Sequence, residues 1–201
     1  MRLAELGWDS NLERAFLEAA ADGCVPARVS EESQGLYRVL AEAGEWLAEI
    51  AGRLRFDALQ RRDLPAVGDW VAVSPRPAEG RATIVAVLPR RTALVRKAAG
   101  RAVEAQVLAA NLDLVFVVTS LNQELNLRRV ERYLALAWES GAQPVVLLSK
   151  ADLAADPAAL AALQAVVEGL APGVPVLAAS AATGSGMASL REVLGRGRTA
   201  V

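Results

Sequence analysis

A lysine and an aspartate two residues apart follow a run of apolar residues near position 150. Val145–Leu148 precede Ser149-Lys150-Ala151-Asp152, so these polar residues are expected at the carboxyl end of a buried strand, where parallel sheets bind ligands. A carboxylate there can accept hydrogen bonds from N1–H and the exocyclic amine of guanine, a donor pair that adenine lacks. The stem of Lys150 can lie against the purine ring. The pattern favours a guanine-reading site, with a polar helix cap at Asp152 as the alternative.

A second polar element strengthens this hypothesis. Ser180-Ala181 follows the next apolar run, one helix and one strand further along the chain. A backbone N–H at this point can donate to guanine O6 while the serine braces the loop. Lys-x-Asp after one strand and Ser-Ala after the next is the order in which GTPases place their base-reading residues. The alternative is a flexible Gly-Ser loop without a ligand.

The motifs that bind the phosphates of a nucleoside triphosphate are not found in the sequence. A phosphate loop needs Gly-Lys followed by Ser or Thr, and neither Lys97 nor Lys150 follows a glycine. None of the eight aspartates has a glycine three residues later, as the Asp-x-x-Gly motif that reaches Mg²⁺ requires. Gly184-x-Gly186 lacks the third glycine of a dinucleotide-binding loop, because position 189 is serine. We therefore expect the chain alone not to hydrolyse GTP.

The composition excludes several other chemistries. The chain has no histidine and one cysteine, Cys24, which excludes Ser-His-Asp triads, Cys-His pairs and the common zinc sites. An internal disulfide cannot form, which fits a reducing compartment. The first residues are charged, and no apolar run approaches the roughly 18 residues of a membrane span. We expect a cytoplasmic protein that does not enter membranes.

The net charge of −1 conceals an uneven distribution. Residues 50–101 carry ten arginines and Lys97 against four acidic residues, a net charge of +7, whereas residues 1–49 carry −6. Each arginine can neutralise a phosphate and release counterions. The middle segment therefore predicts a surface that binds a polyanion. A solvated β surface offset by its acidic neighbour is the alternative.

The spacing of apolar residues predicts a different architecture in each half of the chain. Short strands separated by Gly, Pro and charged turns indicate an OB-fold-like barrel in the first half. We expect a helix over 11–23 and strands over 24–30, 35–42, 45–56, 69–75 and 81–89.

From residue 104 strands alternate with helices, which indicates a parallel α/β sheet. We expect strands over 111–120, 143–150 and 174–180, helices over 126–141, 157–173 and 186–195, and the start of a strand at 198–201. The predicted domains are therefore 1–100 and 101–201. A sheet that stops at this point would expose an unpaired edge and apolar faces, which favour self-association or local disorder.

This order of elements resembles the circularly permuted GTPases, most closely the ribosome small subunit-dependent GTPase A family (RsgA, also YjeQ). The similarity runs through nearly the whole chain and includes PAVGDWVAV, AANLDLVFVVTSLN, RRVERYLALAWESGAQPVVLLSKADL and SAATGSGMASL. In that family a barrel is followed by the base-reading motif, the Ser-Ala loop, the phosphate loop, the switch motifs and a zinc-binding domain. The chain thus resembles the first half of such a protein: an OB-fold-like barrel and a partial, truncated P-loop-type α/β GTPase domain.

The resemblance implies a role for each residue of the base-reading motifs. Asp152 would read guanine, Lys150 would pack on the base, and Ala181 would offer its N–H beside Ser180. Ser149 stands where the family usually has asparagine, a departure that bears on affinity more than on specificity. The guanine-binding candidates are Ser149, Lys150, Ala151, Asp152, Ser180 and Ala181.

The resemblance also implies an activity and partners. Its members hydrolyse GTP, stimulated by the ribosome, in late assembly of the small ribosomal subunit, and their barrel contacts ribosomal RNA (rRNA). Mg²⁺ and Zn²⁺ are implied for the complete protein, but their ligands are absent from this chain. The candidate rRNA contacts are Arg53, Arg55, Arg61, Arg62, Arg90 and Arg91, of which Arg90 and Arg91 could equally pair with acids in the barrel.

Two other interpretations remain open at this point. The chain could be a non-catalytic RNA-binding or interaction module with a vestigial nucleotide domain, or an unrelated α/β enzyme with a barrel appendage. A GxxxxGK[ST] motif soon after Val201 in the parent reading frame would favour the GTPase, and a stop codon would favour the module.

Overall fold

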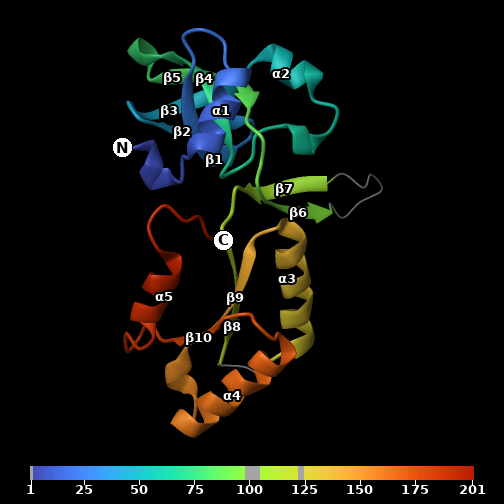
Figure 1. Ribbon diagram of the computed structural model, residues 1–201, viewed down its shortest axis with the longest axis vertical. Helices are drawn as coiled ribbons and strands as arrows, with labels where there is room; N and C mark the ends of the chain where they lie inside the picture. Colours follow the sequence, from blue (N-terminus) through green and yellow to red (C-terminus); the bar gives the residue numbers. More distant parts are fainter. Residues whose placement is uncertain (1, 98–104, 122–124) are drawn as a thin grey trace. The chain divides into compact units, whose positions relative to one another are not determined.

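The computed structural model describes residues 2–97, 105–121 and 125–201, and the chain divides into two compact units (Figure 1). The first unit extends to Leu112 and the second covers Asp113–Val201. This boundary between the two units lies later in the chain than the domain boundary predicted from the sequence, at 100/101. The predicted boundary and Arg101 lie outside the described residues.

The second unit is built on a parallel sheet with the strand order β10-β9-β8. Its strands are β8 (Leu114–Ser120), β9 (Gln143–Ser149) and β10 (Val176–Ala179). The chain end adds to the open side of β8, since the N–H of Leu114 donates to Thr199 and that of Phe116 to Val201, at 3.1 and 2.7 Å. The start of a strand expected at 198–201 is therefore present.

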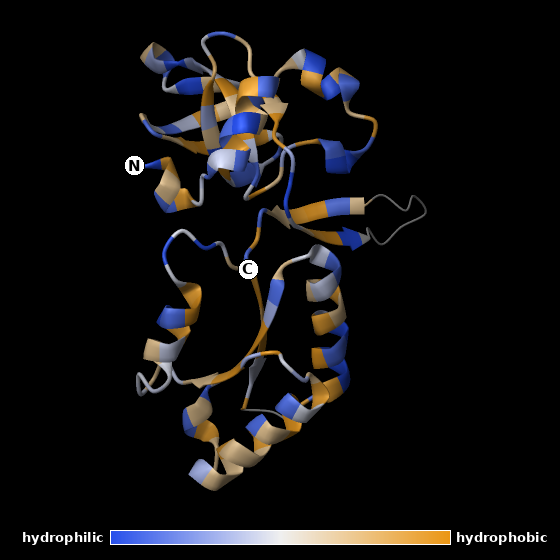
Figure 2. Ribbon diagram, in the orientation of Figure 1, coloured by the Kyte–Doolittle hydropathy of each residue, from blue (hydrophilic) through white to orange (hydrophobic). Residues whose placement is uncertain are grey.

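Three helices connect and cover these strands: α3 (Leu127–Ser140), α4 (Pro157–Leu170) and α5 (Met187–Leu194). Val130 and Leu134 of α3 are buried against Val117 and Val146 of the sheet, whereas the polar residues of α3 lie on its outer side (Figure 2). Spacings of three and four residues place these side chains on one helical face. Among the described residues, no helix has the length and apolar content needed to cross a membrane.

The first unit contains a closed five-stranded barrel, as the sequence predicts. The strand order is β1-β2-β3-β5-β4, with β4 pairing back to β1, and only β3 and β5 run parallel. The strands are β1 (Val25–Ser33), β2 (Leu36–Ala41), β3 (Gly44–Ile50), β4 (Trp70–Arg76) and β5 (Arg81–Val87).

Helical segments lie around the barrel: η1 (Leu3–Leu6), α1 (Ser10–Ala19), α2 (Gly52–Asp57), η2 (Arg61–Asp63) and η3 (Pro77–Glu79). The prediction of a strand over 45–56 is wrong beyond Ile50, because the pairing of β3 with β5 ends at Ile50 and Ile84. The next residues form α2, whose Leu54 packs on the barrel core. The alternating polar and apolar residues of this short helix imitate a strand pattern.

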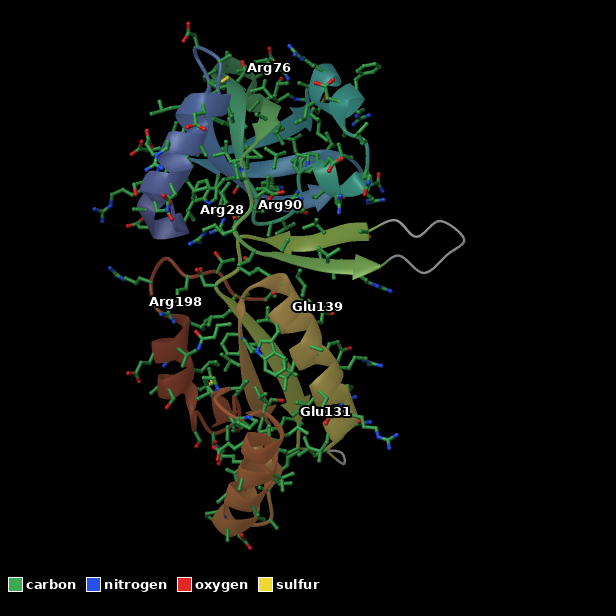
Figure 3. The ribbon with its side chains drawn as sticks, turned by 45° about the vertical axis from the view of Figure 1, so that its right-hand side comes forward. Arg28, Arg76, Arg90, Glu131, Glu139 and Arg198 are labelled. Atoms are coloured by element: carbon green, nitrogen blue, oxygen red, sulfur yellow. The ribbon has the colours of Figure 1, made fainter. Side chains whose placement is uncertain are left out.

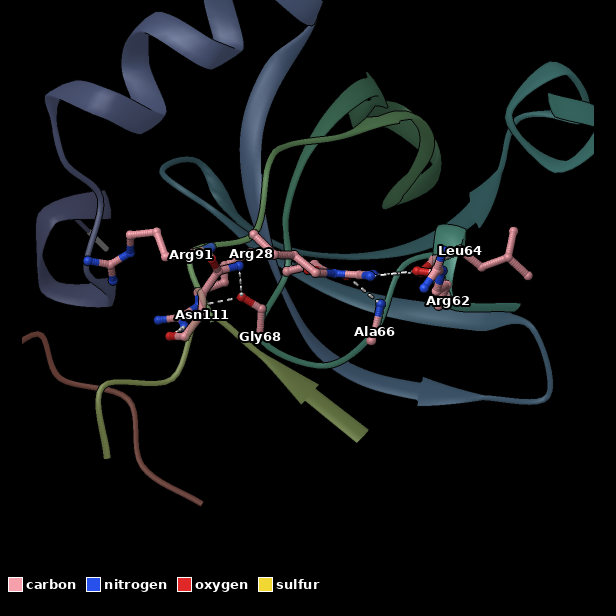
Figure 4. Close-up of polar contacts among 9 residues, drawn as sticks. Arg28, Arg62, Leu64, Ala66, Gly68, Arg91 and Asn111 are labelled. Atoms are coloured by element: carbon pink, nitrogen blue, oxygen red, sulfur yellow. Dashed lines mark hydrogen bonds and ion pairs between the residues drawn. The ribbon is translucent and has the colours of Figure 1, made fainter. Parts of the chain in front are cut away.

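A two-stranded antiparallel sheet, β6 (Ala93–Lys97) and β7 (Ala105–Ala110), completes the first unit and was not expected from the sequence. A buried polar network ties it to the barrel (Figure 4), and Arg28, which belongs to this network, is labelled in Figure 3. Arg28 donates to the carbonyls of Gly68 and Asn111, each at 3.2 Å, and also to that of Leu6. The side chain of Asn111 donates to the same Gly68 carbonyl at 3.2 Å.

At Gly68 the backbone that leads into barrel strand β4 lies directly against the backbone of β7. Its φ is +90°, and a Cβ atom there would lie 2.2 Å from the carbonyl oxygen of Ala110. Gly23 has a similar φ of +82° but open space around it. Gly68 is therefore required both for its left-handed backbone and for the close approach of β7.

We expect Gly68→Ala to destabilise the first unit much more than Gly23→Ala. The left-handed strain alone costs about 1–2 kcal/mol, and displacing packed backbone adds roughly 1–3 kcal/mol at position 68 only. Urea unfolding, followed by tryptophan fluorescence, measures the loss in the free energy of unfolding for each variant. Equal losses for the two variants would contradict the close approach of Gly68 and Ala110.

Candidate guanine-binding site

The parallel register places the two predicted base-reading motifs at one edge of the sheet. Ala179 of β10 pairs with Ser149 of β9, so Ser180 and Lys150 both follow at the same level. Ser149 is also level with Ser120 of β8. The carboxyl ends of all three strands thus meet where open α/β sheets bind ligands.

Asp152 and Ser180 are joined directly at this edge. The hydroxyl of Ser180 donates to Oδ1 of Asp152, and it accepts the N–H of Thr183 at 3.2 Å. Ser180 is fully buried, whereas Asp152 is exposed. The hydrogen bond therefore holds one carboxylate oxygen in place and leaves the other facing solvent.

The backbone around Asp152 has an uncommon conformation. Lys150 has a φ of +57°, a left-handed conformation that costs a non-glycine residue energy and clusters at ligand sites. Its carbonyl accepts the N–H of Leu153 at 3.0 Å, which closes the short helix η4 (Ala151–Leu153) around Asp152. The side chain of Lys150 is exposed.

The loop after β10 is braced by its own backbone. The N–H of Ser180 donates to Ser185 and that of Gly184 to Ser180, both at 2.9 Å. Gly186 ends the loop with a φ of +72°, and a Cβ atom there would lie 2.0 Å from the carbonyl oxygen of Ala178. Ala181 is exposed, and its N–H has no partner among the residues that the structure describes.

Ser149 differs from the other predicted site residues because its polar groups bond to β8 and to the residue that follows it. Its hydroxyl donates to the carbonyl of Thr119 at 3.2 Å, and its own carbonyl accepts the N–H of Leu121 at 3.0 Å. Ser149 therefore ties the end of β9 to the end of β8. Ala151, between Lys150 and Asp152, contributes its backbone to η4.

The groups at this sheet edge offer a hydrogen-bond acceptor and a hydrogen-bond donor. A free carboxylate oxygen, a free N–H and an exposed lysine stem match the donor pair, the O6 atom and the ring face of guanine. Within the described ranges, no three acidic or cysteine side chains come together to hold a metal ion. We therefore assign neither Mg²⁺ nor Zn²⁺ to these residues.

The six arginines proposed as rRNA contacts fall into two groups. Arg90 is bound within the first unit: its Nε and Nη2 donate to the buried carboxylate of Asp69 at 2.7 and 2.6 Å. It also donates to the carbonyls of Arg62 and Leu64, at 2.5 and 2.8 Å. Arg90 is thus a structural residue, as the burial of Asp69 requires a paired charge.

Arg91 lies near the end of barrel strand β5 and approaches another part of the same unit. Its Nη1 is 3.9 Å from Oδ2 of Asp9, the residue that caps α1. Its backbone N–H donates to the side chain of Asn111 at 3.1 Å. Arg91 is half-exposed but has partners within the fold.

The other four arginines, Arg53, Arg55, Arg61 and Arg62, are exposed on α2 and η2. Arg55 and Arg61 line a cavity of about 550 Å³ in the first unit. Tyr37 and Glu32 also line it, and burial, together with the negative charge of Glu32, raises the pKa of the Tyr37 hydroxyl. Tyr37 therefore stays a neutral hydrogen-bond donor at physiological pH.

Comparison with known proteins decides the family. Residues 87–201, more than half of the chain, match the family model described as RsgA GTPase. This chain belongs to the RsgA GTPase family. The sequence-based assignment to this family is thereby confirmed.

Individual relatives agree with the family match. The chain is 46% identical to the small ribosomal subunit biogenesis GTPase RsgA of Opitutus terrae, over 99% of this chain and 56% of that protein. It is also 46% identical to the protein of the same description from Streptomyces coelicolor, over 97% and 52%. The chain therefore spans about half the length of these relatives.

Two solved structures share the fold. YjeQ from Thermotoga maritima superposes with a TM-score of 0.70 and 25% identity, covering 88% of this chain and 59% of that one. YloQ, described as a circularly permuted GTPase, has a TM-score of 0.63 and 20% identity, over 86% and 56%. The predicted fold class, an OB-fold-like barrel followed by a partial α/β domain of the P-loop GTPase type, is confirmed.

We expect Asp69→Asn to destabilise the first unit by about 3 kcal/mol, because it leaves the partly buried guanidinium of Arg90 without its counter-charge. Urea unfolding measures this loss. Glu79→Gln is the matched control: it removes an exposed carboxylate 3.1 Å from Arg76, a kind of pair worth less than about 1 kcal/mol. A similar loss in both variants would show that the Asp69–Arg90 pair is not structural.

Proposed function

We propose that this chain reads the guanine base for a GTPase that acts in assembly of the small ribosomal subunit. The observation that carries this proposal is the Ser180–Asp152 hydrogen bond at the carboxyl ends of adjacent parallel strands. Family membership supports it, and the names of the relatives supply the assembly role. Hydrolysis by the complete protein, a requirement for Mg²⁺ and a zinc-binding domain are part of this proposal.

The chemistry of base reading follows from the free groups at the sheet edge. Asp152 Oδ2 accepts from the N1–H and exocyclic amine of guanine, while Ser180 holds the other oxygen. The N–H of Ala181 donates to O6, and the stem of Lys150 covers one face of the ring. Adenine offers neither the donor pair nor O6, so the site discriminates against it.

The barrel is the proposed rRNA-binding part. Arg53, Arg55, Arg61 and Arg62 are exposed and close in sequence, and each can neutralise one phosphate. A non-catalytic RNA-binding module with a vestigial nucleotide domain is the second candidate, favoured by the same exposed arginines, which can bind RNA without any nucleotide. We place the protein in the cytoplasm.

Self-association through the second unit is a further part of the proposal. Val118 of β8 is 58% exposed and Val201, paired next to β8, is 48% exposed. Apolar side chains on an open sheet favour contact with a second copy of the chain.

The test of base reading is calorimetric titration of the chain with GDP, GTP and ADP. We expect weak binding of both guanine nucleotides and none of ADP, and we expect Asp152→Ala to abolish it because guanine loses its acceptor. Glu168→Ala is the control, since it removes an exposed carboxylate from the same unit. Equal affinity for ADP, or full binding by Asp152→Ala, would contradict base reading. RNA binding without any nucleotide binding would favour the second candidate.

A further inference from the structure

Two large apolar side chains stand out from the surface of the first unit. Phe56 is 88% exposed and Leu59 is 91% exposed, the two highest values among the large apolar residues described. Single exposed apolar side chains are ordinary. These two, however, lie on one short segment together with Arg53, Arg55, Arg61 and Arg62.

The fold holds Phe56 outward. Leu54 packs on the barrel core, and a residue two positions further along a helix points to nearly the opposite side. The following turn is fixed as well: Oδ2 of Asp63 accepts the N–H groups of Leu59 and Gln60, at 3.1 and 2.9 Å. The exposed ring is therefore carried by an anchored backbone.

The charged residues close to Phe56 in the sequence indicate the chemistry of the partner. Arg53 is 92% exposed and only 3.6 Å from Oδ2 of Asp57, an exposed pair that a phosphate can replace at little cost. Among the residues that the structure describes, Arg55 and Arg61 form no ion pair. They line the cavity of about 550 Å³ beside Tyr37, a volume typical of small-ligand pockets.

We propose that α2 and η2 bind single-stranded RNA, with an unpaired base stacked on Phe56 and neighbouring phosphates bound by Arg55 and Arg61. The proposal rests on the rRNA-binding role given to the barrel and assigns it a form of RNA. An exposed aromatic ring among arginines suits unstacked bases, which present a π-face. Paired RNA keeps its bases stacked and offers phosphates and 2′-hydroxyls instead.

The experiment measures fluorescence anisotropy of a labelled single strand of about ten nucleotides, and of the same strand in a duplex, at several salt concentrations. The full chain is compared with Phe56→Leu, which keeps an apolar side chain but removes the ring. We expect Phe56→Leu to bind the single strand about tenfold more weakly with the same salt dependence, and to bind the duplex unchanged. Phe56→Trp should restore binding.

Two further variants separate this inference from the proposed function. Replacing Arg55 and Arg61 by glutamine should reduce the slope of log affinity against log salt by about 0.7 per arginine. Leu17→Ala removes a 71% exposed apolar side chain on α1 and should leave binding unchanged.

The outcomes distinguish base stacking on Phe56 from rRNA binding by the barrel in general. Full binding by Phe56→Leu together with weakened binding by the arginine variant would overturn the stacking proposal and leave rRNA binding intact. Equal losses for single strand and duplex would also overturn stacking. No RNA binding by the unsubstituted chain would overturn the rRNA-binding role itself, and stacking with it.

Discussion

In the second unit, Ala179 of β10 lies opposite Ser149 of β9 in a parallel pair, and the candidate site depends on this register. A shift of one residue would turn every side chain to the other face of the sheet. With the observed register, Ser180 is buried at the level of Lys150 and its hydroxyl reaches Asp152. The proposed base-reading groups are thus positioned by strand pairing and one part-buried hydrogen bond.

The arginines of the first unit are of two kinds: some are buried or partly buried and stabilise the fold, and others are exposed to solvent. Arg28 and Arg90 are used inside the fold, where they satisfy backbone carbonyls and the buried carboxylate of Asp69. Because Arg90 also bonds the carbonyl of Arg62, the same buried pair fixes the segment that carries the exposed arginines. The backbone that carries the exposed arginines is therefore anchored to the barrel through Arg90.

Much of this architecture could be predicted from the sequence, because alternating and helical spacings of apolar residues report burial directly. The barrel strands, the three helices of the second unit and the proximity of Asp152 to Ser180 follow from such spacings. Helix α2 could not be predicted, since its burial depends on Leu54 alone. The β6–β7 sheet depends on the long-range approach of Gly68 to Ala110, which no local pattern reveals. For Arg90 the sequence leaves acid pairing as one of two alternatives, and the long-range pair with Asp69 decides for it.

We propose above that the carboxylate of Asp152 accepts hydrogen bonds from N1–H and the exocyclic amine of guanine. Xanthine has a carbonyl group where guanine has that amine, and an asparagine side chain can donate to a carbonyl whereas a carboxylate cannot. The most direct test is therefore the affinity of Asp152→Asn for xanthosine diphosphate and for GDP, compared with the unsubstituted chain. We expect the preference to reverse, from GDP to the xanthine nucleotide. An unchanged preference for GDP in the variant would contradict it.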